Sequence, residues 1–84
     1  MEISLNNSLN KAVKTKEAQM LAAERTSILL EIAKVKSELT DAYNNFNHVE
    51  DSLLVDYYTY QIKAYEAKFE YLIKRAKSMG LNNI

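Results

Sequence analysis

The chain has 84 residues, with 11 acidic and 11 basic side chains, one Gly, no Pro and no Cys. This length allows one small domain, and the scarcity of Gly and Pro disfavours β-sandwich and α/β folds, which need turn residues at regular intervals. Without Cys, neither a disulfide framework nor a thiolate metal site can form. The Lys and Arg residues are interleaved with Glu, which disfavours a dedicated nucleic-acid binder.

The sequence shows no targeting or membrane segment. No apolar run reaches the roughly 18–20 residues of a membrane span. The first residues, Met1-Glu2-Ile3-Ser4, lack the basic start of a secretory signal. We therefore expect a soluble cytoplasmic protein that does not associate with membranes.

Residues 1–14 are expected to form an N-terminal arm that is either frayed or helical. Its three Asn residues disfavour a helix because Asn side chains compete for backbone hydrogen bonds. Its apolar residues nevertheless follow helical spacing, at Leu5, Leu9 and Val13. Firm helix is expected from about residue 15 onward.

A heptad pattern predicts two long helices, over residues 15–47 and 52–79. Their apolar residues recur in alternating steps of three and four, which is the spacing of a coiled-coil seam. The first helix has these residues at Leu21, Ile28, Ile32, Val35, Leu39, Ala42 and Phe46. The second helix has them at Val55, Tyr58, Ile62, Tyr65, Phe69, Leu72, Ala76 and Met79.

The residues between and after the helices carry the start and stop signals. Asn tolerates turn conformations, so the first helix should end near Asn47 and leave residues 48–51 as a hinge. Asp51 is a good N-cap for the second helix. Gly80 is placed to end that helix in a left-handed conformation, which leaves residues 80–84 as a C-terminal tail.

Folding at this hinge gives an all-α, antiparallel two-helix hairpin that resembles a short coiled coil. The apolar residues then face one another in layers, such as Ile32 opposite Phe69 and Leu21 opposite Met79. Charged residues beside the seam fall opposite one another as three predicted cross-helix pairs: Glu31–Lys68, Glu24–Arg75 and Lys36–Glu66. Each exposed pair contributes at most about 1 kcal/mol, so the apolar layers should dominate stability.

The second helix has another apolar stripe, which points away from the seam. It consists of Tyr57, Tyr60, Ala64 and Tyr71, again at helical spacing. Tyr is partly exposed on many protein surfaces, and it is also enriched at binding hot spots. The stripe is therefore either ordinary surface or an interface. Small domains without disulfides or metals often gain stability by oligomerising. Two hairpins could associate as a four-helix bundle dimer.

The sequence contains no recognisable catalytic, cofactor or metal site. His48 lies in the hinge near Glu50 and Asp51, where a single His is more often a solvated polar residue than a metal ligand. The Glu-x-x-His motif of di-iron bundles is absent because residue 45 is Asn, and a single Gly excludes Gly-rich phosphate loops. We expect no enzymatic activity, no cofactor and no small-molecule substrate.

Residues of the hinge and the second helix form a recognisable pattern: Asn44-Asn45-Phe46-Asn47, Val49, Asp51, Val55-Asp56-Tyr57-Tyr58, Ala67, Tyr71-Leu72 and Lys74-Arg75-Ala76-Lys77. This pattern resembles the YaaL-like family of small bacterial proteins of unknown function. The resemblance spans roughly residues 28–79, and the chain departs from the family pattern at His48, where an aromatic often stands, and at Ser52, where Pro is common. It implies a cytoplasmic bacterial protein with a helical hairpin and carries over no catalytic residue.

The favoured interpretation is a non-enzymatic module for protein–protein interaction or self-association. Its partner would be a second copy of the chain, as a homodimer, or another protein. The alternative is a nucleic-acid-associated accessory protein that uses the basic N-terminal half, at Lys11, Lys14, Lys16 and Arg25. Glu17 and Glu24 dilute this basic excess, which disfavours the alternative.

Overall fold

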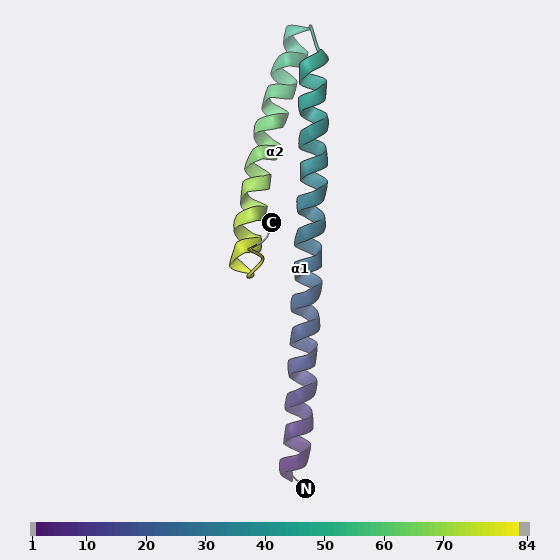
Figure 1. The fold of residues 1–84 in the computed structure, drawn as a ribbon, viewed down its shortest axis with the longest axis vertical. Helices are drawn as coiled ribbons and strands as arrows, with labels where there is room; N and C mark the ends of the chain where they lie inside the picture. The colour runs from purple at the N-terminus through teal and green to yellow at the C-terminus, as the bar shows by residue number, and fades with distance from the viewer. Residues whose placement is uncertain (1, 83–84) are drawn as a thin grey trace.

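The computed structural model describes residues 2–82 of the chain, with side chains from residue 11 onward. It contains two helices, α1 over Glu2–His48 and α2 over Ser52–Ser78, and no strand among the described residues. The helices pack side by side and antiparallel, as Figure 1 shows. The prediction of an all-α fold with two helices is confirmed. The molecule is a rod of 76 × 17 × 15 Å.

α1 begins at Glu2, well before the firm helix expected from residue 15. Residues 2–14 are therefore helical, and residue 1 lies outside the described part. The sequence contains no Pro, and its one Gly stands at residue 80, so nothing in the arm breaks a helix. At 1.5 Å per residue α1 is about 70 Å long and α2 about 40 Å long. Roughly 30 Å of α1 thus extends beyond the end of α2 (Figure 1).

The connection between the helices consists of residues 49–51, and Asp51 is the N-cap of α2. Its backbone is extended, and its carboxylate accepts hydrogen bonds from the Leu53 amide at 2.8 Å and the Leu54 amide at 3.4 Å. These amides have no partner inside the helix, so the cap satisfies them. At the end of α1, Nδ1 of His48 donates to the Asn44 carbonyl at 2.6 Å, which gives this residue a structural function.

The end of α2 is a Schellman motif built on Gly80. Gly80 has φ of +85°, a left-handed conformation that Gly adopts without a steric cost. The amide of Gly80 donates to the Lys77 carbonyl, and the amide of Leu81 donates to the Ala76 carbonyl, both at 3.0 Å. Leu81 packs against the core. Within the expected tail, Leu81 is thus held against the hairpin, and residues 83–84 lie outside the described part.

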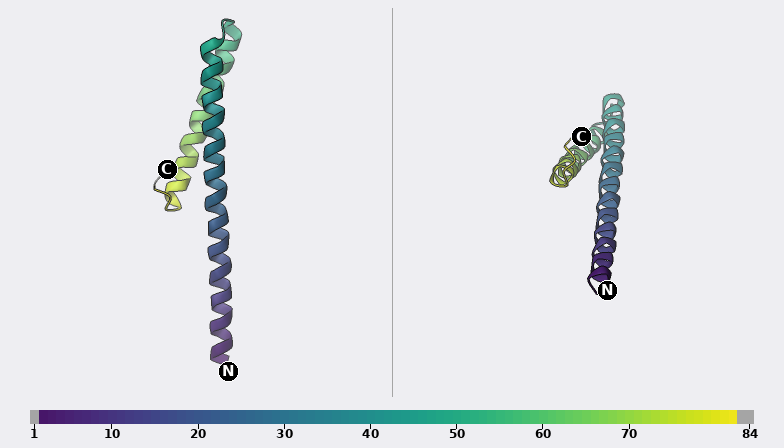
Figure 2. Two further views of the ribbon diagram at one scale, coloured as in Figure 1. Left: turned by 45° about the vertical axis from the view of Figure 1, so that its right-hand side comes forward. Right: turned by 60° about the horizontal axis from the view of Figure 1, so that its bottom comes forward.

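The core lies between the helices, where the heptad seams meet. Five buried side chains from both helices form one cluster, with Val35 and Leu72 its largest fully buried members: Ile28, Ile32, Val35, Leu72 and Ala76. The prediction that Ile28, Ile32 and Val35 face α2 agrees with this cluster. Figure 2 shows the helices diverging toward the end of α2. Leu21, which was expected to pack on Met79, is half exposed, since the helices have separated at this end of the hairpin, whereas Met79 packs against the core cluster.

Candidate interaction surface

The outer face of α2 is apolar, aromatic and open to solvent. Its exposed fractions are 53% for Tyr57, 71% for Tyr60 and 59% for Tyr71, and Ala64 between them is also exposed. These residues are on the side of α2 that points away from α1, because the residues of α2 at the seam are the buried ones. The structure therefore brings the four predicted interface residues together on one exposed strip.

One tyrosine of the strip contacts a half-buried neighbour in the seam. The ring of Tyr57 stands edge to face against the ring of Tyr58, with centroids 5.0 Å apart and an interplanar angle of 74°. Tyr58 is half-buried in the seam, and the Tyr57 hydroxyl accepts a long hydrogen bond from Nε2 of Gln61 at 3.4 Å. Tyr57 is thus held in place, whereas the rings of Tyr60 and Tyr71 project into solvent.

Two residues that the sequence interpretation missed extend this strip. Leu53 is 78% exposed, the largest fraction among the exposed large hydrophobic residues of the described chain, and Ala67 is exposed as well. Both continue the spacing of three and four residues already present in the Tyr stripe, and that spacing was the signal that could have found them. We call the six residues the outer seam: Leu53, Tyr57, Tyr60, Ala64, Ala67 and Tyr71.

The charged flanks of the hairpin differ from prediction. Both ion pairs among the described residues lie within one helix, Lys34–Glu38 in α1 and Glu70–Lys74 in α2. The predicted pairs Glu31–Lys68, Glu24–Arg75 and Lys36–Glu66 do not form ion pairs across the helices.

The reason is that side chains lean toward the N-terminus of their own helix, which shifts contacts along both helices. The ammonium of Lys36 lies 5.8 Å from the centre of the Phe69 ring, one turn beyond the predicted Glu66. The Glu66 carboxylate instead accepts a hydrogen bond from the Tyr43 hydroxyl at 2.5 Å.

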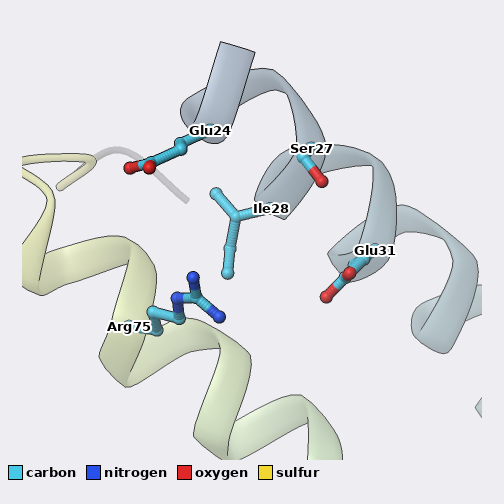
Figure 3. A pocket seen from close by; sticks show the side chains of 5 residues that line it. All are labelled: Glu24, Ser27, Ile28, Glu31 and Arg75. Carbon is cyan, nitrogen blue, oxygen red and sulfur yellow. The ribbon is translucent and has the colours of Figure 1, made fainter. Parts of the chain in front are cut away.

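The side chain of Arg75, near the open end of the hairpin, also lies away from its predicted position opposite Glu24. Figure 3 shows its guanidinium pointing toward Ile28, between the carboxylates of Glu24 and Glu31. These residues and Ser27 line a shallow hollow of about 100 Å³. That volume is far below the roughly 300–1,000 Å³ of a small-molecule site.

A second hollow lies between the helices near the hinge. It measures about 370 Å³ and has a largely apolar lining that includes Phe46 and Ile62. Its polar side is occupied by the Tyr43–Glu66 hydrogen bond, which, together with partial desolvation, raises the pKa of Tyr43 above its ordinary value. Burial, and then the neighbouring Glu38 carboxylate, raises the pKa of Tyr65 in the seam. In both cases the surroundings disfavour the ionised tyrosine.

The basic residues of the N-terminal half do not form one stripe. Lys11, Lys14, Lys16 and Arg25 are all exposed. Consecutive residues are about 100° apart around a helix, so Lys11, Lys14 and Arg25 lie on one side of α1, whereas Lys16 points to nearly the opposite side. Glu17 and Glu24 stand among them and line a separate hollow with Met20 and Leu21. Lys14 and Arg25 are 11 residues apart in α1, so the basic residues on this side are not spaced as a continuous stripe.

The described residues hold neither a metal cluster nor a membrane span. No group of three or more His, Asp or Glu side chains is placed to hold a metal ion within residues 11–82, whose side chains the structure describes. Neither α1 nor α2, as far as the structure describes them, has a segment long and apolar enough to cross a membrane.

Comparison with known protein families matches residues 9–83 to the family described as protein of unknown function, DUF2508. The chain belongs to the DUF2508 family. This match covers nearly the whole hairpin and confirms the resemblance to the YaaL-like proteins, which are the same family. Searches of curated proteins and of solved structures give no match.

Proposed function

We propose that this member of the DUF2508 family is a non-enzymatic interaction module that acts in the cytoplasm, and that the outer seam of α2 is its docking surface. The observation that carries the proposal is that the hairpin exposes more large apolar side chains than it buries. Among the side chains that the structure describes, seven hydrophobic residues are buried, whereas twelve large hydrophobic residues are exposed. Four of the twelve lie together on the outer seam: Leu53, Tyr57, Tyr60 and Tyr71. Exposed apolar strips of this kind mark interaction sites on soluble domains.

The chemistry of the strip also supports docking. Tyr residues carry a large apolar surface with one polar atom and lose little conformational entropy on binding, which makes them frequent hot spots. The partner is a second copy of the chain or another protein. The hairpin supports the strip at one end, because the Tyr57 ring packs edge to face against the half-buried Tyr58.

A double variant, Tyr60→Glu with Tyr71→Glu, tests the proposal by sedimentation and by affinity capture. Both residues are exposed, so the hairpin should keep its helical circular dichroism while self-association or partner capture is lost. Leu30→Glu is the matched control, since Leu30 is 67% exposed on α1 and lies outside the outer seam. A monomeric wild type whose captured proteins are the same with and without the double change would contradict the proposal.

A further inference from the structure

We infer that the occupant of the outer seam is a second copy of this chain, bound with its α2 antiparallel and with Ala64 opposite Ala67 of the second copy. The inference rests on the proposed function and identifies the partner of that docking surface. In this register the complete outer seam of each chain lies within the interface. The contact then extends over nearly the whole of α2, which is about 40 Å long.

The heptad spacing of the outer seam fixes which residues share a layer. Leu53, Tyr60 and Ala67 occupy one core position of the heptad, and Tyr57, Ala64 and Tyr71 occupy the other. In an antiparallel pair, each residue at one core position faces a residue at the other core position of the second helix. Ala64 and Ala67 then meet on both sides of the twofold axis, where their small side chains allow the helices to approach closely, at about 8 Å.

Aromatic layers follow on each side of this central contact. Tyr60 falls opposite Tyr71 of the second copy, and by symmetry Tyr71 falls opposite Tyr60. These are the two most exposed tyrosines of the seam, so the dimer covers the surface that the hairpin leaves uncovered. In the next layer Tyr57 faces Lys74, and an ammonium against an aromatic ring is a favourable contact.

Charge complementarity selects this register over its neighbours. The flanking residues on one side of the outer seam are Asp56, Lys63, Glu70 and Lys77, all exposed and alternating in sign. With Ala64 opposite Ala67, Lys63 faces Glu70 and Asp56 faces Lys77, each pair twice. A shift of one heptad in either direction brings Lys63 opposite Lys63 or Glu70 opposite Glu70, which is repulsive.

The same charges favour the antiparallel over the parallel orientation. A parallel pair would place Lys63 of one chain against Lys68 of the other, two like charges whose repulsion offsets the attraction of Glu70 to Arg75. The antiparallel pair has only attractive contacts between charges on this flank. Because the outer seam points away from α1, the four helices of the antiparallel dimer lie in the order α1, α2, α2, α1. They form a layer of four helices.

Charge reversal tests the register by sedimentation equilibrium. Lys63→Glu places a second carboxylate opposite Glu70, and Glu70→Lys places a second ammonium opposite Lys63, so each variant alone should raise the dimer dissociation constant by about tenfold or more. An equimolar mixture of the two variants should associate as tightly as the wild type, because both reversed pairs are then attractive. Lys34→Glu on α1 is the control: it removes an exposed ion pair outside the seam and should leave the constant unchanged.

The outcomes separate this inference from the proposed function. Tighter association of Lys63→Glu alone would indicate the parallel orientation or the register in which Lys63 meets Lys77, and either overturns the inferred register. Tighter association of Glu70→Lys alone would indicate the register in which Asp56 meets Glu70, which also overturns it. A wild type that stays monomeric overturns the second copy as the occupant. In that case, loss of partner capture by the Tyr60→Glu, Tyr71→Glu variant would still support docking of another protein at the outer seam.

Discussion

Replacement of Asp51 by Ala should destabilise the hairpin through the start of α2. The Asp51 carboxylate accepts a short hydrogen bond of 2.8 Å from Leu53 and a long one of 3.4 Å from Leu54. Loss of an N-cap side chain costs about 1 kcal/mol, within a range of roughly 0.5–2 kcal/mol. Loss of a negative charge at the positive end of the helix adds about 0.3–1 kcal/mol. The expected total is about 1–2 kcal/mol.

The matched variant Asp51→Asn separates the two contributions. Asn keeps an oxygen that can accept the cap hydrogen bond, so only the charge contribution of about 0.3–1 kcal/mol should be lost. Urea unfolding followed by circular dichroism at equal protein concentration measures both variants, and the urea dependence should keep its slope. Equal stability of Asp51→Ala and wild type would refute the assignment of Asp51 as the cap that starts α2.

Three further changes probe the stop signal, the core and the neutral tyrosines. Gly80→Ala should cost about 1–2 kcal/mol in urea unfolding, since the left-handed backbone is strained for Ala although no atom obstructs its Cβ. Leu72→Ala should cost about 2–5 kcal/mol because Leu72 is 2% exposed, whereas Leu30→Ala on the surface should change stability by less than about 0.5 kcal/mol. The pKa of Tyr43 is higher in the folded than in the unfolded chain, so its hydrogen bond to Glu66 contributes fully to stability below pH 10. That contribution to stability is lost as the pH rises through the folded-state pKa. The free energy of unfolding, measured against pH, should fall over this range, and the fall should be smaller for Tyr43→Phe.

The hinge and the end of α2 could be predicted from the sequence because they depend on interactions between neighbouring residues. Asp51 and Gly80 each act through backbone groups within a few residues, so their functions follow from residue type and position. The buried seam was readable because the heptad spacing of Ile28, Ile32 and Val35 leaves one apolar face.

The contacts between charged and polar side chains beside the seam could not be predicted in this way. A heptad diagram pairs residues at the level of their Cα atoms, whereas side chains lean along their helices by a large part of a turn. Lys36 therefore reaches Phe69 and not Glu66, and Tyr43 takes Glu66 as its partner. The full extent of the outer seam was also missed, because Ala67 is apolar but small and Leu53 stands next to the cap.

Hydroxyl-radical footprinting at increasing protein concentration is the most direct test of the outer seam as the surface that a second copy covers. Tyr60 and Tyr71 should become protected as the protein associates, while Leu30, 67% exposed on α1, should keep its reactivity as the internal control. The opposite result is equally clear. If the protein associates and Tyr60 and Tyr71 react as fast as in the dilute chain, the outer seam is not the interface.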